Sequence, residues 1–331
     1  MINKLYEGIK ENYKTLLFFI ILFLIFCIKL PLYISAPGGI INTDEKIKIS
    51  SDFKLKGSLN MAFVSQIDGN VPILLYALVN PNWDIEREKD ITTGSESPED
   101  MEYRNKMLLK EANNTALLVA FNHSNTQYKT ENHKIYITYI DDLAKTNLKL
   151  GDQIIKVDGH DVLKKQDLYD YISTKKPADK VEFTVIRKGK QKKCISELIN
   201  IENEAKVGVV ITEVMDIKSD THVEFKFKDS ESGSSGGLIT ALTIYSYLNK
   251  IDLTAGKKIV ATGTIDIDGN VGEISGIKYK LIGAVKEKAD VFLVPQGKNY
   301  TEARDLKNKK GYDIDIIPVE TFEEALKYLQ T

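Results

Sequence analysis

Residues 229–280 carry the most informative sequence pattern of this chain. It opens with Asp-Ser-Glu-Ser-Gly-Ser-Ser-Gly-Gly-Leu-Ile-Thr and closes with Gly-Glu-Ile-Ser-Gly-Ile-Lys-Tyr-Lys. The small-residue loop Gly233–Gly237 runs directly into an apolar segment whose side chains recur at helical spacing up to Asn249. The loop therefore feeds the N-terminus of a helix, where free N–H groups stabilise an anion and two adjacent serines offer a nucleophile.

The far end of this stretch places Lys278 near the start of another predicted helix, from Gly276 to Lys288. A serine beside an anion-binding helix end, with a lysine to accept its proton, forms a Ser-Lys dyad. The simpler interpretation is a flexible Gly-Ser loop and a solvated lysine. The strongly apolar helix that follows the loop favours the dyad.

The region from about Val207 to the C-terminus resembles the proteolytic domain of Lon (endopeptidase La), most of all that of bacterial membrane-anchored relatives that add a PDZ domain. The family's Gly-Pro-Ser-Ala-Gly motif falls on residues 233–237, which implies Ser235 as the nucleophile, flanked by Gly233 and Ser234. The family's Gly-Gly-Ile-Lys segment falls on residues 275–278 and implies Lys278 as the base. Thr262 matches a family threonine and is expected to hydrogen-bond the lysine amine.

Four positions depart from the family pattern. Ser234 replaces a proline, Gly236 an alanine, Ser232 an acid and Ser275 a glycine. None of these changes removes a reacting group, and backbone N–H groups around Gly233 to Ser235 are expected to hold the oxyanion. The departures keep open an alternative, a PDZ scaffold or chaperone with an impaired protease domain.

The composition limits the number of domains and the classes of binding partner. The 331 residues, 43% hydrophobic and 28% charged, are enough for two or three compact domains. A net charge of −2 gives no electrostatic argument for nucleic-acid binding. No zinc motif and no Gly-x-x-x-x-Gly-Lys-[Ser/Thr] loop occurs, so we expect no metal, no cofactor and no ATP.

The N-terminal segment, residues 1–35, is interpreted as a cytoplasmic tail and transmembrane anchor. An unbroken apolar run from Leu16 to Ile28, extended by Lys29 to Ile34, matches the length of a bilayer-spanning helix. Lys4, Lys10 and Lys14 precede the run and favour a cytoplasmic N-terminus. A cleaved signal peptide is the rival interpretation. The expectation is a single-pass protein of the cell membrane, with the lipid bilayer as a partner and both folded domains outside the cytoplasm.

Residues 36–130 are expected to be an extracytoplasmic connecting region of strands plus a helix. Leu59–Val64 and Val71–Leu78 are predicted as strands around an Asp-Gly-Asn hairpin signal. Met101–Phe121 has helical periodicity.

Residues 131–201 resemble a PDZ domain through Leu148-Lys-Leu-Gly-Asp-Gln-Ile-Ile-Lys-Val-Asp-Gly159, a glycine-aspartate turn followed by a strand and an Asp-Gly turn. Such domains bind an extended peptide between a strand and a helix, by strand addition. The predicted groove residues are Ile135, Tyr136, Ile137, Leu168 and Ile172. The alternative is that this domain only packs against the protease.

The predicted fold class is α+β: a transmembrane helix, a β-rich PDZ-like domain at 131–201 and a Lon-type proteolytic domain with a mixed sheet at 202–331. The function implied is an ATP-independent serine endopeptidase whose PDZ domain recruits or gates protein or peptide substrates. The sequence also allows a homo-oligomer. A Ser-His-Asp triad through His222 remains the rival catalytic arrangement.

Overall fold

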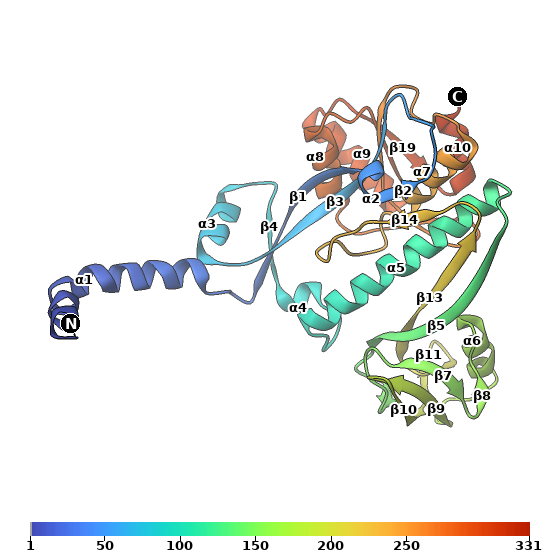
Figure 1. Ribbon diagram of the computed structural model, residues 1–331, viewed down its shortest axis with the longest axis horizontal. Helices are drawn as coiled ribbons and strands as arrows, with labels where there is room; N and C mark the ends of the chain where they lie inside the picture. The colour runs from blue at the N-terminus through green and yellow to red at the C-terminus, as the bar shows by residue number, and fades with distance from the viewer. Residues whose placement is uncertain (1) are drawn as a thin grey trace.

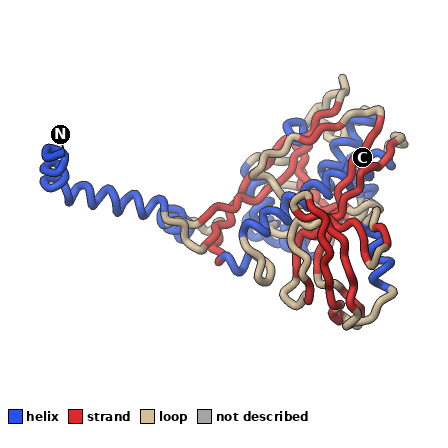
Figure 2. The backbone as a smooth tube through the Cα atoms, turned by 60° about the horizontal axis from the view of Figure 1, so that its bottom comes forward, coloured by secondary structure: helices blue, strands red, loops and turns tan. Residues whose placement is uncertain are grey.

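The computed structural model describes residues 2–331, apart from the side chains of residues 2–9 and 11. A body made of two separate sheets carries a long arm that ends in helix α1 (Ile2–Cys27) (Figure 1). Figure 2 shows the same arm from another direction, with α1 standing clear of the strands. The predicted N-terminal flank includes Lys4, whose side chain lies outside the described part.

The predicted membrane anchor is overturned. Among the described residues, no helix combines the length and the apolar character needed to cross a bilayer. The apolar part of α1 begins at Leu16 and the helix ends at Cys27, whereas a bilayer needs roughly 20 apolar helical residues. The extension from Lys29 to Ile34 is not helical, because strand β1 begins at Leu32. The single-pass localisation inferred from this helix is corrected with it.

The first sheet belongs to the C-terminal part of the chain but takes half of its strands from the N-terminal part. Its order is β19 (Asp315–Val319), β18 (Val291–Pro295), β15 (Lys258–Ala261), β3 (Ser58–Asp68), β1 (Leu32–Asn42) and β4 (Asp84–Arg87). The strands from β19 to β3 are parallel, and β1 and β4 are antiparallel to their neighbours. The expected mixed sheet is therefore present.

Helices cover both faces of this sheet. Along β15, Ile259 and Ala261 pack against α7 (Gly237–Asn249), whereas Val260 packs on the side of α8 (Ile277–Lys286), because successive side chains of a strand point to opposite faces. The remaining helices of this unit are α9 (Lys298–Lys310) and α10 (Phe322–Leu329). Residues 58–68 thus lie at the centre of the C-terminal fold and do more than connect domains.

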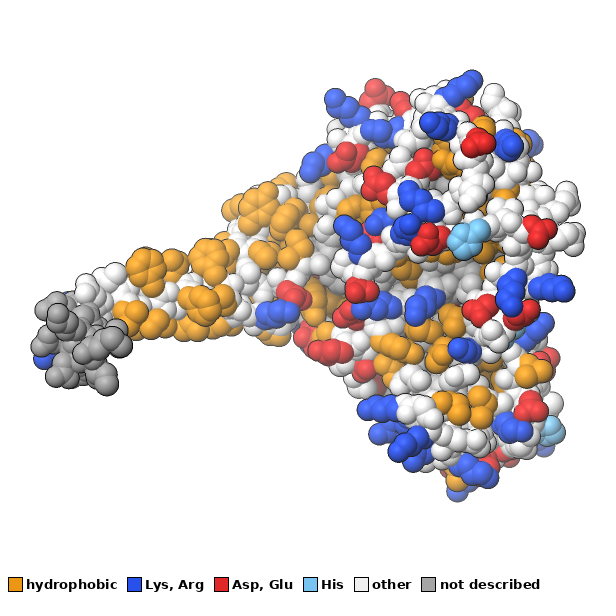
Figure 3. Space-filling model, viewed as in Figure 1, with side chains coloured by type: hydrophobic (Ala, Val, Ile, Leu, Met, Phe, Trp, Pro, Cys, Tyr) orange, Lys and Arg blue, Asp and Glu red, His pale blue; other side chains and the backbone are white. Residues whose placement is uncertain are grey.

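One predicted strand is wrong. Residues from Val71 form helix α3 (Val71–Val79), because the Asn70 side chain caps the N–H of Ile73 at 3.0 Å and Pro72 occupies the first turn. The apolar α3 continues the arm with α1, and Leu78 and Val79 are exposed. Figure 3 shows apolar side chains along this arm and interspersed charges over the body.

The second sheet contains the predicted PDZ-like strands. Its order is β13 (Val209–Ser219), β5 (Tyr128–Ile140), β7 (Gln153–Val157), β9 (Lys180–Arg187), β10 (Lys190–Glu197) and β6 (Lys145–Thr146), with β8 (His160–Asp161) paired to β7. Helix α6 (Lys165–Ser173) closes its core. The sheet extends past residue 201, because β13 pairs with β5 along most of its length.

Helix α5 (Pro98–His123) runs between the two sheets, and its predicted helical periodicity is confirmed. A capping box of Ser97 and Asp100 starts it. The short elements that complete the fold are α2 (Thr43–Lys46), α4 (Glu88–Ile91), β2 (Ile47–Ile49) paired with β14 (Val223–Phe225), β11 (Ile199–Ile201) with β12 (Glu204–Lys206), and β16 (Thr264–Ile265) with β17 (Val271–Gly272).

Candidate active site

Ser235 lies in the turn that leads into α7 and is half-buried. Two neighbours hold its carbonyl oxygen: the N–H of Gly263 donates at 2.8 Å and the Thr262 hydroxyl at 3.1 Å. The Gly237 N–H donates to the carbonyl of Ser234 at 3.2 Å and closes the turn. The main chain of Ser235 is therefore fixed by the residues that follow β15.

The loop before Ser235 is anchored to α5. The Gly233 N–H donates to the carbonyl of Asn105 at 2.9 Å, with Gly233 at a φ of 94°, in the region that favours glycine. This donor, which the sequence assigned to the oxyanion site, is already engaged. The N–H groups of Ser234, Ser235 and Gly236 make no hydrogen bond in the described part of the chain.

Close packing explains why residue 236 is a glycine. A Cβ at this position would meet Met61 Cε at 2.5 Å and Sδ at 2.7 Å. The Met61 side chain from β3 therefore fills the place that an alanine methyl group takes in the family motif. The departure at residue 236 is matched by a neighbour and leaves the helix start intact.

Lys280 is the lysine that reaches Thr262. Its Nζ donates to Thr262 Oγ1 at 3.0 Å, and the two residues are 3% and 0% exposed. Burial lowers the pKa of Lys280 to about 7, because removal from water disfavours the charged form. Thr262 therefore contacts both the lysine amine and the main chain of Ser235.

Lys278 does not contact Thr262 and pairs with Asp84 of β4. Its Nζ pairs with Asp84 Oδ2 at 2.5 Å, and its side chain is 32% exposed. Residues two apart on a helix do not share a face, so Lys278 and Lys280 point in different directions. The expected hydrogen bond between Thr262 and a lysine amine is present, but it comes from Lys280 and not from Lys278.

The sequence pattern of α8 already distinguishes Lys280 from Lys278. Ile277, Leu281 and Ala284 are buried and share one face of α8 with residue 280. A lysine at that position of an apolar stripe is desolvated, whereas Lys278 falls on the polar side.

The Asp84 carboxylate also accepts from the Tyr279 hydroxyl at 2.5 Å. Burial alone would raise the pKa of Asp84, but the hydrogen bonds from Lys278 and Tyr279 outweigh it and lower this pKa. Burial and the bond to Asp84 raise the pKa of Tyr279. This cluster fixes the first turn of α8 to strand β4.

His222 is exposed between β13 and β14, and no hydrogen bond to it is present in the described part of the chain. The arrangement around Ser235 therefore gives no support to a triad through His222.

The five residues predicted for the peptide groove do not lie together: Leu168 and Ile172 line a cavity, whereas Ile135, Tyr136 and Ile137 do not line it. Ile135 and Ile137 are buried in the domain core, and both edges of their strand β5 are covered, by β13 and by β7. Tyr136 pairs with Thr212 of β13. A cavity of about 320 Å³ instead lies between α6 and the start of β13. It is lined by Leu168, Ile172, Tyr169, Val207, Val209 and Val210, among others.

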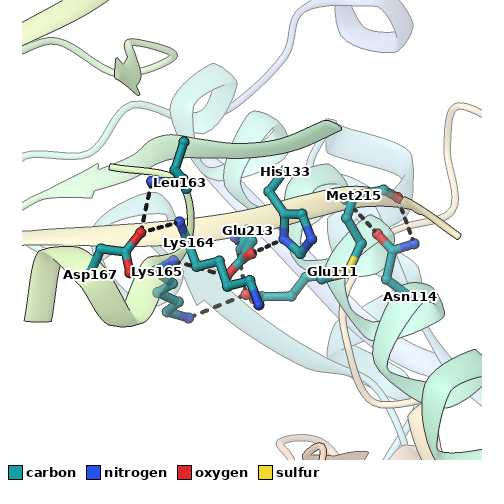
Figure 4. A network of polar contacts seen from close by, with 9 residues as sticks. All are labelled: Glu111, Asn114, His133, Leu163, Lys164, Lys165, Asp167, Glu213 and Met215. Carbon is teal, nitrogen blue, oxygen red and sulfur yellow. Dashed lines mark hydrogen bonds and ion pairs between the residues drawn. The ribbon is translucent and has the colours of Figure 1, made fainter. Parts of the chain in front are cut away.

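Side chains of α5 bond the middle of the β13 edge, at Glu213 and Met215. Asn114 donates to the carbonyl of Met215 at 3.1 Å and accepts from its N–H at 3.3 Å. Glu111 accepts from the N–H of Glu213 at 3.1 Å. Figure 4 shows this network, in which the Glu213 carboxylate also contacts His133 and the N–H of Lys165 at the start of α6. Helix α5 thus contacts both the loop before Ser235 and the PDZ-like sheet.

Comparisons with known proteins agree with this division. Residues 116–196 match the family model of the PDZ domain, and residues 202–331 match that of the Lon protease (S16) C-terminal proteolytic domain. A Lon protease of Campylobacter jejuni is 33% identical over 99 residues, which cover 30% of this chain and 12% of that protein. A Lon protease of Xanthomonas oryzae is 30% identical over 110 residues, 33% of this chain and 13% of that protein.

The chain therefore spans only about an eighth of the length of these relatives. Among solved structures, the PDZ domain of an SdrC-like protein from Listeria monocytogenes is 24% identical, covering 25% of this chain and 92% of that one, with a TM-score of 0.24. The chain carries a PDZ domain followed by a Lon-type C-terminal proteolytic domain, and these matches support the predicted serine endopeptidase.

Proposed function

We propose that this chain is a serine endopeptidase in which Ser235 is the nucleophile and Lys280, in place of Lys278, is the general base. The observation that carries the proposal is the buried Lys280 amine, 3.0 Å from Thr262 Oγ1, with its pKa lowered to about 7. A lysine with such a pKa is partly neutral near neutral pH and can accept a proton.

The reaction follows from these groups. The Ser235 hydroxyl oxygen attacks the carbonyl carbon of the scissile peptide bond while its proton passes to the neutral amine of Lys280. The ammonium then gives the proton to the leaving nitrogen, the C–N bond breaks, and an acyl-enzyme remains. Lys280 next takes a proton from the attacking water and returns it to the Ser235 oxygen as the ester bond breaks, which releases the acid product and restores the serine hydroxyl.

The oxyanion is assigned to N–H groups that the structure leaves open. Ser235 and Gly236 precede the first turn of α7, and their N–H groups have no partner in the described part of the chain. A helix N-terminus favours negative charge. Gly233 takes the supporting role of fixing the loop, because its N–H is bound to Asn105.

We also propose that cleavage needs no ATP, since the printed sequence contains no Gly-x-x-x-x-Gly-Lys-[Ser/Thr] loop. Substrates are then flexible tails or chains that are already unfolded. The PDZ domain recruits such chains in the cavity between α6 and β13, where Leu168 and Ile172 meet the edge strand of the sheet.

A fluorophosphonate probe, which reacts with activated serines, tests the proposal. We expect covalent labelling of the wild-type chain at Ser235, located by mass spectrometry, full labelling of Ser234→Ala and none of Ser235→Ala. Lys280→Met should label far more slowly than Lys278→Met. An unlabelled but folded wild-type chain would favour the alternative, a PDZ scaffold with an inactive protease domain.

A further inference from the structure

Strand β3 extends beyond its neighbour in the sheet. β15 pairs with β3 only from Ser58 to Met61, whereas β3 continues to Asp68. On its other edge, β3 remains paired with β1 up to Asp68. Figure 1 shows β1 and β3 leaving the body together along the arm. From residue 62 onward, therefore, one edge of β3 has no strand beside it in the described part of the chain.

The register shows which main-chain groups point to this open edge. The Gly69 N–H donates to the carbonyl of Leu32 at 2.8 Å, so that pair is hydrogen-bonded. In an antiparallel ladder hydrogen-bonded pairs alternate with pairs that are not. The Pro37–Val64 pair is one of those without mutual hydrogen bonds, which agrees with the lack of an N–H on Pro37. Val64 and Gln66 therefore direct their N–H and C=O groups away from β1.

These groups have no other partner. No backbone hydrogen bond from Val64 or Gln66 to anything but a neighbouring strand is present in the described part of the chain, and Gln66 is exposed. An open row of N–H and C=O groups is a template for another strand.

The open edge begins next to the proposed catalytic groups. Met61, the last residue paired with β15, lies against Gly236, which directly follows the nucleophile. A Cβ on Gly276, directly before the helix of Lys280, would lie 2.8 Å from the Val64 side chain. The edge thus starts between the turn that carries Ser235 and the helix that carries the base.

We propose that the main chain of an extended peptide substrate adds as a strand to the open edge of β3, at Val64 and Gln66, and so presents its scissile bond to Ser235. This inference rests on the proposed protease function and specifies how its substrate is held. Main-chain hydrogen bonds do not depend on side-chain identity. The substrate class is therefore any unfolded, extended segment, with modest side-chain selectivity. The strand that binds it lies outside the matched residues 202–331.

The first test changes the substrate and leaves the enzyme intact. A synthetic peptide that the chain cleaves is N-methylated at one backbone nitrogen at a time. Positions whose N–H would pair with β3 should lose about 3- to 10-fold in kcat/KM, the usual worth of one hydrogen bond. Those positions should alternate with tolerant ones, because a strand has a period of two residues. Equal effects at all positions would overturn the proposal.

The second test changes the enzyme. Gln66→Pro removes one outward N–H from β3 and should raise KM about 3- to 10-fold with kcat little changed. Ile85→Pro is the matched control on β4, the last strand at the far side of the sheet. Asp84 and Glu86 pair with Ser35 and Tyr33, so the Ile85 N–H also points outward. Equal KM values for the two variants would contradict the proposal.

Two further outcomes are separable. If Gln66→Pro fails to fold, shown by its circular dichroism spectrum, the N-methyl series alone decides. If no peptide is cleaved and Ser235 reacts with no fluorophosphonate, the protease function itself has failed. Labelling of Ser235 and cleavage without any alternation would instead reject only the strand-addition mode.

Discussion

The Thr262 hydroxyl joins Lys280 to the nucleophile turn: it accepts from Lys280 Nζ at 3.0 Å and donates to the Ser235 carbonyl at 3.1 Å. The Thr262 hydroxyl thus donates one hydrogen bond to the main chain of Ser235 and accepts one from Lys280. This leaves the lysine amine without a charged partner. Burial keeps its pKa low, and no carboxylate among the described residues is paired with it.

The two lysines of α8 should differ sharply on substitution. Lys280→Met should lower kcat about 10²- to 10⁴-fold, the usual contribution of a general base. Lys280→Arg should be as inactive, since arginine keeps its charge. Lys278→Arg should retain most activity, because it can still pair with Asp84. Steady-state hydrolysis of a fluorogenic peptide measures all three. An inactive Lys278→Arg beside an active Lys280→Met would restore the assignment made from the sequence.

Activity should rise with pH around neutrality. The pKa of Lys280 is lowered to about 7, so the neutral amine that accepts the proton becomes the main form above that pH. The pH profile of kcat/KM for the free enzyme should therefore show a rising limb with its midpoint near 7. A profile that stays flat from pH 6 to 9 would argue against Lys280 as the base.

The lowered pKa of Lys280 also predicts how the stability of the protein depends on pH. The folded-state pKa of Lys280 lies below its unfolded value of 10.5, so the unfolded chain binds more protons between these two values. Lys280 therefore lowers stability at acidic pH, and this penalty is lost as the pH rises from about 7 to 10.5. Lys280→Met should raise Tm more at pH 6 than at pH 10, measured by differential scanning fluorimetry. The exposed Lys286→Met is a control without such dependence.

Thr262 should matter through its hydroxyl. Thr262→Val keeps the shape but leaves the Lys280 amine and the Ser235 carbonyl without this partner, so kcat should fall by about tenfold or more. Thr262→Ser restores the hydroxyl and should recover most of the loss. A full loss in both variants would indicate a packing role for the threonine methyl group.

Peptide recruitment should depend on the cavity between α6 and β13. Val210 lines it and is 46% exposed, so Val210→Asp can disturb binding without disturbing the core. We expect slower cleavage of an unfolded protein substrate and unchanged cleavage of a short peptide. Ile195→Asp, at an equally exposed site of the same domain outside the cavity, is the control. Equal loss on both substrates would support a purely structural PDZ domain.

The sequence predicted most of the local structure around the site. The loop at Ser235, helix α7 and Thr262 lie where the motifs placed them, because glycine and serine turns before apolar helices leave clear patterns. The contact of Lys280 with Thr262 was not predicted, because Lys278 and Lys280 stand in one short motif and only the spacing of the buried residues of α8 distinguishes them.

Other errors came from non-local pairing. Nothing in residues 58–68 reveals that β3 will lie beside β15, some two hundred residues later, and the covering of β5 by β13 is equally invisible in a local pattern. The strand predicted from Val71 failed for a local reason, since Asn70 and Pro72 are helix-start signals inside an apolar run.

The position of β3 also bears on how the chain reaches its native state. Because β3 pairs with β15, the first sheet joins segments that are synthesised far apart in time. The PDZ sheet lies between them in the chain, and its first and last strands meet at the Tyr128–Ser219 pair. The PDZ domain is therefore an insertion that can fold early and bring the two halves together. A fragment beginning at residue 202 would expose β15 as an unprotected edge and would be prone to aggregate.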